Sequence, residues 1–190
     1  MPVQPVRVCR ERIYKFKFER HVPRKPRPLG RGASLPEEKS MKMPSNLKSL
    51  LKDLFSSQPL AVLATHSNGQ PYGNLVAFAA TEDLRGLLFA TARGTRKFAN
   101  MTKDPRVAMV MDSRTNQRVD FQTAVAVTAT GIVEEVEGAE RDHLLKLYLL
   151  KHPYLKKFVK SPNSVLLRVK VDSYYMVRRF QNVIVLSMQQ

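Results

Sequence analysis

Short apolar segments separated by turn-forming residues fill most of the chain after residue 59, and they constrain the fold more than any other feature. Segment 60–66 is followed by Asn68-Gly69, a pair that favours the type I′ turn of a β-hairpin, and then by a returning segment at 71–80. Further strands are expected at 87–92, 105–112, 121–136 and 164–180, the last interrupted near Asp172-Ser173. Hairpin connections make neighbouring strands antiparallel, and closing them into a barrel removes the free edges. The predicted fold class is therefore mainly β (α+β), an antiparallel barrel with a few flanking helices.

Three helices are expected beside the strands. The first begins at 45 with Ser45 as its N-cap, shows apolar residues at helical spacing, and ends at Gln58-Pro59. The second covers 95–103 and the third, amphipathic, covers 139–151.

The positive charge is concentrated at the start of the chain. The formal net charge is +16, and residues 1–42 carry 12 basic and 4 acidic residues together with six of the twelve prolines. Repelling charges and proline oppose a packed core, so we expect two parts, a basic Pro-rich arm at 1–42 and a globular domain at 43–190. The arm is interpreted as a solvated tail, with binding of nucleic acid or of an anionic surface through residues 1–42 as the alternative. A third hypothesis is that translation starts at Met41 or Met43.

Composition excludes several classes of protein. One cysteine, Cys9, gives no internal disulfide or cysteine-rich zinc site, and the four histidines lack metal-binding spacing, so we expect no metal site. No apolar run approaches the roughly 20 residues of a membrane span, and no apolar signal segment follows the N-terminus. The expected location is the cytoplasm, with no membrane partner. Neither GxxxxGK[ST] nor a GxGxxG motif after a strand is present, which disfavours nucleotide folds that use those loops.

The stretch from 88 to 98 carries the clearest chemical signal. A strand ends, Gly94 turns the chain, and a helix begins with Arg96 and Lys97 in its first turn, where the helix dipole favours acidic residues. An anion bound in the turn would remove that conflict, since Thr91 and Thr95 can donate hydroxyl hydrogen bonds while Arg96 and Lys97 supply charge. The pattern predicts a phosphate cradle, and charge alone equally allows a surface helix of a basic protein.

The order of these motifs resembles the flavin-binding split β-barrel family that includes pyridoxamine 5′-phosphate oxidase. The resemblance covers 60–136 and rests on the strand ending in Thr91, the Gly94-Thr-Arg-Lys97 turn, and the segments 104–108 and 131–135. It extends loosely to 177–181 and leaves out 1–42.

The resemblance implies a homodimer with two FMN sites in the subunit interface. It implies that Thr95, Arg96 and Lys97 hold the phosphate, that Thr91 supplies a hydroxyl, and that one strand backbone follows the flavin ring. The strand residues are Asn74, Leu75, Val76 and Ala77. The opposite subunit would close the site with residues between Asn116 and Gln122.

The sequence also departs from the family. It has no Arg-x-His-Asp-Arg-like segment near its end, and its second strand lacks the Arg and Lys of the oxidase, so oxidation of pyridoxamine phosphate is not expected. The prediction is an FMN-binding oxidoreductase without a nameable acid or base. Alternatives are a flavin protein without turnover, deazaflavin F420 in place of FMN, and a nucleic-acid-binding module; haem is disfavoured because no axial ligand is identifiable.

Overall fold

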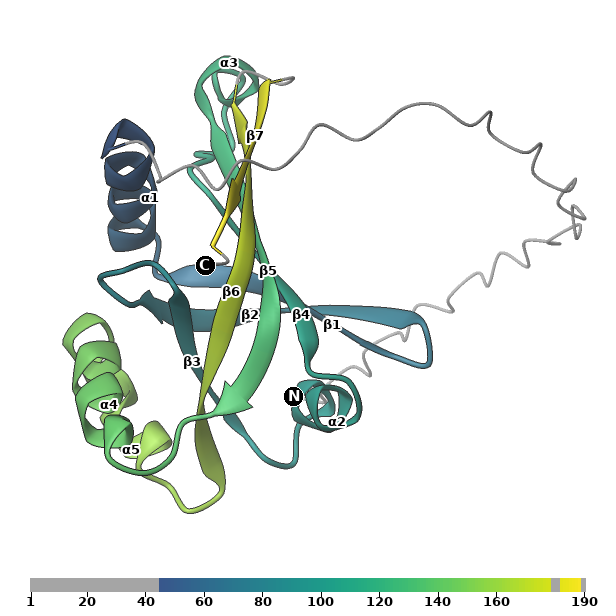
Figure 1. Cartoon of the computed structure of the whole chain (residues 1–190), viewed down its shortest axis with the longest axis vertical. Helices are drawn as coiled ribbons and strands as arrows, with labels where there is room; N and C mark the ends of the chain where they lie inside the picture. The colour runs from purple at the N-terminus through teal and green to yellow at the C-terminus, as the bar shows by residue number, and fades with distance from the viewer. Residues whose placement is uncertain (1–44, 179–181, 189–190) are drawn as a thin grey trace, which may run out of the picture. The chain divides into compact units, whose positions relative to one another are not determined.

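Six antiparallel strands form a closed barrel, which confirms the predicted fold class (Figure 1). The structure is a computed structural model that describes residues 45–178 and 182–188. The strand order is β3-β2-β1-β4-β5-β6-β7, and an additional β3–β6 pairing closes the barrel. β7 pairs with the second half of β6 and lies outside the closed ring. The strands are β1 (Leu60–Ser67), β2 (Gln70–Ala80), β3 (Gly86–Ala92), β4 (Arg106–Asp112), β5 (Val125–Glu135), β6 (Ser164–Arg178) and β7 (Asn182–Ser187).

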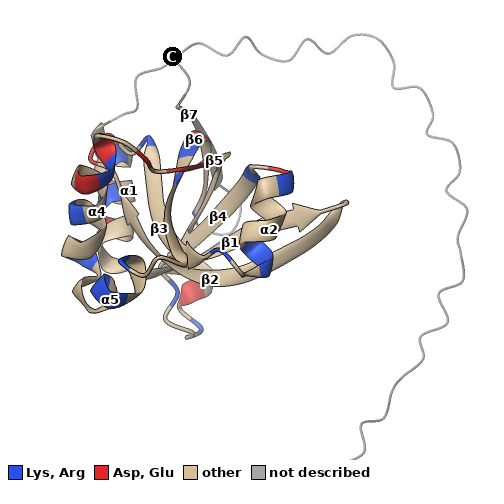
Figure 2. Cartoon of the chain, turned by 90° about the horizontal axis from the view of Figure 1, so that it is seen from below, with Lys and Arg blue, Asp and Glu red and all other residues tan. Residues whose placement is uncertain are grey.

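The helices cover the barrel on two sides. α1 (Ser45–Ser57), α4 (Glu140–Lys151) and α5 (Lys156–Val159) lie on one side and α2 (Arg96–Lys103) on the other, as both views show (Figure 1, Figure 2). α1 buries Leu51, Leu54 and Phe55 in the main core. α4 buries Leu144, Leu145 and Tyr148 in a second cluster with the outer side chains of β2, β3 and β6. The short helices α3 (Asp120–Thr123) and η1 (Pro153–Leu155) complete the fold.

The sequence misplaced several boundaries. Ser45 is the first residue of α1 rather than its cap. The strand expected from 121 begins at Val125, because the Asp120 carboxylate accepts hydrogen bonds from Thr115 and Gln117 and gathers the chain into a loop and α3. β7, α5 and η1 were not predicted, and part of the expected strand end at 180 lies outside the described residues, as does the expected arm at 1–42.

A β-bulge stands where the sequence predicted an interruption of the last long strand. Thr130 pairs with Ser173 and Gly131 with Val171, so Asp172 is an extra residue in the β5–β6 ladder. A Cβ on Gly131 would lie 2.0 Å from the Lys170 carbonyl oxygen, so the two backbones can approach this closely only at a glycine.

Two side chains at the end of α4 link this helix to its neighbours. Lys151 donates to the carbonyls of Phe55 (2.5 Å) and Gln58 (2.7 Å), which end α1, and its half-buried amine has a pKa lowered to about 8 by burial. His152 has no exposed surface, and its Nε2 lies 2.8 Å from the Phe78 carbonyl of β2. No helix in the described residues is long and apolar enough to cross a membrane.

His152 predicts how stability responds to acid. Burial lowers its pKa below 6.5, so the unfolded chain binds a proton that the folded chain does not. Stability should therefore fall as the pH drops below about 6.5, the unfolded value. His152→Gln should flatten this dependence, measured by urea unfolding at several pH values, whereas the exposed His143→Gln should not. An unchanged dependence in His152→Gln would contradict this role.

Candidate functional site

The barrel is split between β2 and β3 next to the predicted site. β2 pairs with β1 along all of 70–77, but in the described residues it pairs with β3 only through Phe78, Ala79 and Ala80. Beyond this point β3 continues along β6, with Thr91 opposite Val165. The Phe78 N–H points to Pro59 on the β1 side, so by strand alternation the backbone groups of Leu75 and Ala77 point toward the split. The Ala77 carbonyl already accepts a hydrogen bond from the Tyr148 hydroxyl at 3.4 Å, so a ligand edge placed there would meet mainly the backbone donor and acceptor of Leu75.

The turn after β3 is built around two threonines. Thr95 is the N-cap of α2, its hydroxyl accepting from the Phe98 N–H at 3.4 Å and donating to the Ala92 carbonyl at 2.9 Å. The buried Thr91 hydroxyl lies 3.1 Å from that of Thr95. The hydroxyl pair fixes the turn, so the backbone N–H groups at the start of α2 are held in position.

The first turn of α2 presents uncompensated positive charge. It contains no acidic residue, and neither Arg96 nor Lys97 forms an ion pair with an acid of the described residues. Arg96 is exposed, and Lys97 is half-buried, which lowers the pKa of its amine. Two cations beside a helix N-terminus repel its dipole unless an anion is bound between them. Arg93, the third nearby cation, is already paired with Glu135 and lies over the Phe98 ring.

Asn74 provides the second sign of a missing ligand. Both polar atoms of its side chain are buried and have no hydrogen-bond partner. An unpaired buried amide costs about 1–3 kcal/mol, so native structures rarely contain one without a bound group or partner chain to satisfy it. Asn74 shares a face of β2 with Tyr72, whose ring lies 4.8 Å below the Arg96 guanidinium. The unsatisfied amide therefore lies close to the basic turn.

Three residues that were not among the predicted site residues support the turn, although Asn100 belongs to the motifs that carry the family resemblance. Tyr72 holds Arg96 by a cation–π contact. Asn100 of α2 is buried and donates to the Thr65 hydroxyl of β1 at 3.0 Å, which fixes α2 on the barrel. In the sequence each of them is only a single polar residue within a largely apolar segment. A residue at the surface would give the same pattern.

The remaining predicted residues divide into two groups. Leu75 is 63% exposed, Val76 is buried in the barrel and Ala77 pairs with Leu60, so this strand offers backbone rather than side-chain chemistry. Asn116 and Gln122 are exposed and lie near α3, at the start of β5. Val125, next to the loop, pairs with Arg178 of β6, whereas Thr91, next to the basic turn, pairs with Val165 of the same strand. Arg178 and Val165 are about 40 Å apart along β6. A single chain therefore does not bring the loop at 116–122 next to the basic turn. That the loop of a second subunit closes the site stays a prediction.

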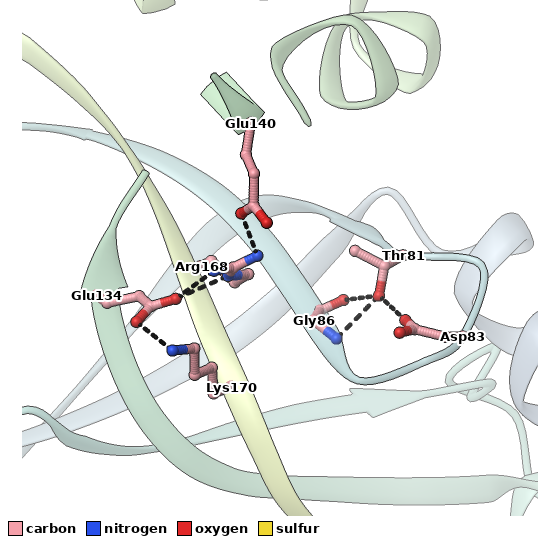
Figure 3. Close-up of polar contacts among 7 residues, drawn as sticks. All are labelled: Thr81, Asp83, Gly86, Glu134, Glu140, Arg168 and Lys170. Carbon is pink, nitrogen blue, oxygen red and sulfur yellow. Dashed lines mark hydrogen bonds and ion pairs between the residues drawn. The ribbon is translucent and has the colours of Figure 1, made fainter. Parts of the chain in front are cut away.

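Two cavities among the described residues lie away from the basic turn. One of about 630 Å³ is lined by the β2–β3 turn, α4 and the middle of β6, and another of about 360 Å³ lies between α1 and α4. Neither is lined by a residue of the basic turn. Arg168 bridges Glu134 and Glu140, and Lys170 pairs with Glu134 (Figure 3). Two of the cations that line the larger cavity are thus already paired, whereas Arg85 of the same lining forms no ion pair among the described residues. The described residues contain no group of three or more metal-ligating side chains.

The comparisons with known proteins identify the family. The pyridoxamine 5′-phosphate oxidase family model matches residues 47–178, and the chain belongs to this family. No curated protein sequence matches significantly.

Solved structures with the same fold bind different groups. A haem-binding protein from Mycobacterium smegmatis matches with a TM-score of 0.67 and 16% identity, over 77% of this chain and 60% of its own. ChuZ from Campylobacter jejuni matches with a TM-score of 0.64 and 16% identity, over 79% of this chain and 63% of its own. An FAD-binding protein from Mesorhizobium loti matches with a TM-score of 0.55 and 17% identity, over 67% of this chain and 90% of its own. The chain thus spans less than two thirds of the first two proteins, and at these identities the likeness shows the fold.

Replacing Asn74 tests whether its amide belongs to a ligand site. Asn74→Leu removes a buried unpaired amide, so the ligand-free protein should become more stable, by about 1–3 kcal/mol. The same variant should lose stabilisation by added FMN, because the group that the amide contacts has lost its partner. Thermal unfolding with and without FMN measures both effects, and Asn100→Leu, which breaks a satisfied pair, should only destabilise. Unaltered stabilisation by FMN in Asn74→Leu would contradict the assignment.

Proposed function

We propose that this chain is an FMN-binding oxidoreductase of the cytoplasm that works as a homodimer. The observation that carries the proposal is the unneutralised basic turn of Thr95, Arg96 and Lys97, set beside a barrel split with an unsatisfied amide. The turn suits a phosphate monoester, the Leu75 backbone suits the polar edge of a flat heterocycle, and the Asn74 amide offers its N–H groups as donors and its oxygen as an acceptor.

The protein residues bind and orient, while a flavin supplies the redox chemistry when bound. Arg96, held by Tyr72, would bind the phosphate oxygens of such a cofactor, and Lys97 would add a point charge. Thr91 and Thr95 fix the turn so that its N–H groups are preorganised for the same oxygens. Deazaflavin F420 also carries a phosphate and remains the alternative cofactor.

Pyridoxamine phosphate is not the proposed substrate, although the chain belongs to the family named after its oxidase. The strand that faces the split is uncharged from Asn74 to Ala80, so it offers no cation for a second phosphate. A protein that holds flavin without turnover is the alternative, and it predicts bound FMN that NAD(P)H does not reduce.

Haem is a weaker candidate because a haem iron needs an axial ligand. His152 is buried, and both of its ring nitrogens lie within hydrogen-bond distance of Phe78 or Tyr154. His66 Nε2 lies 3.1 Å from the Asp104 carboxylate. Each of these two histidines therefore has its Nε2 beside a partner, and we assign neither as a haem ligand.

The outer face of the sheet supports the proposed homodimer. Register pairs place one outward side chain from each strand in a row across six strands, Leu75, Val62, Val110, Thr128, Tyr175 and Val185. Leu75 is 63% exposed, Tyr175 40% and Val185 52%, and this row contains no charge. In a closed barrel such a row runs around the wall, so the exposed, uncharged pair of Tyr175 and Val185 on the neighbouring strands β6 and β7 is the part that one subunit interface would use.

Charge in this row should prevent the dimer. Tyr175→Glu and Val185→Glu together should give a monomer in light scattering after size exclusion, because burying two carboxylates against their symmetry copies is costly. The exposed Leu150→Glu on α4 is the matched control and should remain dimeric. A dimeric Tyr175→Glu/Val185→Glu variant would place the interface elsewhere.

Removing the two cations of the turn tests the proposed site directly. Arg96→Ala with Lys97→Ala should lower FMN affinity by at least about 100-fold, since two charge-assisted contacts contribute about 1.5–3 kcal/mol each. Flavin absorbance that remains with the protein after gel filtration measures occupancy, and circular dichroism checks the fold. Lys103→Ala at the other end of α2 should keep its flavin. Equal occupancy in the double variant and the wild type would overturn the proposal.

A further inference from the structure

One corner of the fold exposes large apolar side chains, of which Tyr154 also contacts the core through its hydroxyl, 3.3 Å from His152 Nδ1. At the end of α4 and through η1 and α5, Leu150 is 89% exposed, Tyr154 72% and Phe158 41%. These three lie within nine consecutive residues, 150–158. We call residues 146–160 the α4–α5 corner. Isolated exposed apolar residues are ordinary, but three large ones in one short segment mark a contact surface.

The corner is also strongly basic. From 143 to 171 the chain has seven lysines and arginines and no aspartate or glutamate. Lys146, Lys156, Lys157 and Lys160 are exposed, and none of them pairs with an acid of the described residues. Figure 2 shows lysine and arginine on α4 and α5, with acidic residues at the start of α4, where Glu140 and Asp142 lie.

The exposed side chains stand on a rigid base. Tyr148, His152 and Val159 are buried beneath the corner, and Lys151 and His152 bond it to α1 and β2. The chain therefore cannot rotate Leu150 or Phe158 into the core without breaking these contacts. Because the corner is fixed in this way, the exposed apolar side chains of Leu150, Tyr154 and Phe158 would be covered by a binding partner rather than by this chain.

We propose that the α4–α5 corner docks on the surface of an anionic lipid bilayer without spanning it. Lysines beside Leu, Tyr and Phe match such an interface, because the ammonium groups reach the lipid phosphates while the apolar tips enter the boundary between headgroups and acyl chains. A second copy would bring lysine against lysine, and residues 1–42, with a net charge of +8, are equally unsuited. A nucleic acid would use the lysines but leave Leu150 without a partner. The sequence predicted no membrane partner because no segment can span one, and docking needs no span.

Vesicle sedimentation of the full-length protein tests the proposal. The protein should bind vesicles of phosphatidylcholine with about one third phosphatidylglycerol, fail to bind pure phosphatidylcholine, and dissociate at high salt. Lys156→Gln/Lys157→Gln/Lys160→Gln should lower the partition coefficient at least about tenfold, given roughly a fivefold effect for each lysine at such a surface. Leu150→Ser/Tyr154→Ser/Phe158→Ser should lower it to a similar degree. Lys103→Gln/Arg114→Gln/Arg118→Gln is the charge-matched control and should bind as the wild type does.

A tryptophan probe gives a second, site-specific readout, because the chain contains no tryptophan. Tyr154→Trp should shift its emission to shorter wavelength when phosphatidylglycerol vesicles are added, and Phe121→Trp in α3, at the far end of the described fold, should not. The basic residues 1–42 are present in every variant, so unchanged vesicle binding in both corner triples overturns the proposal. Binding of single-stranded RNA without vesicle binding, abolished by the lysine triple, also overturns it and assigns the corner to nucleic acid.

Discussion

The parting of β2 from β3 is the constraint on which the proposed site depends. A barrel satisfies its backbone by pairing every edge, yet here β3 leaves β2 after three residue pairs and closes the ring on β6 instead. The edge of β2 toward the split keeps backbone groups that face no strand, and the chain leaving β3 forms the basic turn beside them. One topological feature thus brings backbone edge, hydroxyl pair and cations into one place.

Polar contacts hold this arrangement where apolar packing alone would leave it loose. Asn100 bonds to Thr65 and fixes α2 on β1, and Tyr72 fixes Arg96 from β2. The two contacts join α2 to β1 and to β2, the strand on one side of the split. Because the side chains are held before a ligand arrives, less conformational entropy is lost on binding. The unpaired amide of Asn74 has the opposite character, since it costs stability that a ligand would return.

The sequence predicted what depends on local pattern. Alternation and the Asn68-Gly69 turn gave the antiparallel barrel, and the dipole argument located the turn at Thr95, Arg96 and Lys97. Local patterns could not reveal contacts between segments that are distant in the sequence, such as that of Tyr72 with Arg96. They also could not reveal the helical turn at Asp120, because it depends on hydrogen bonds from the preceding loop to the Asp120 carboxylate. They also missed β7, which has neither a predicted turn before it nor a long periodic run. The closure of the site by Asn116 and Gln122 of a second subunit stays a prediction.

The affinities of FMN and riboflavin for the wild-type protein, compared by titration calorimetry, test the central claim most directly. The two ligands share the ring and differ in the phosphate, so their ratio isolates the contribution of the basic turn. The account predicts that FMN binds at least about 100-fold more tightly and that the advantage shrinks with salt. Equal affinities, or no binding of either, would contradict it.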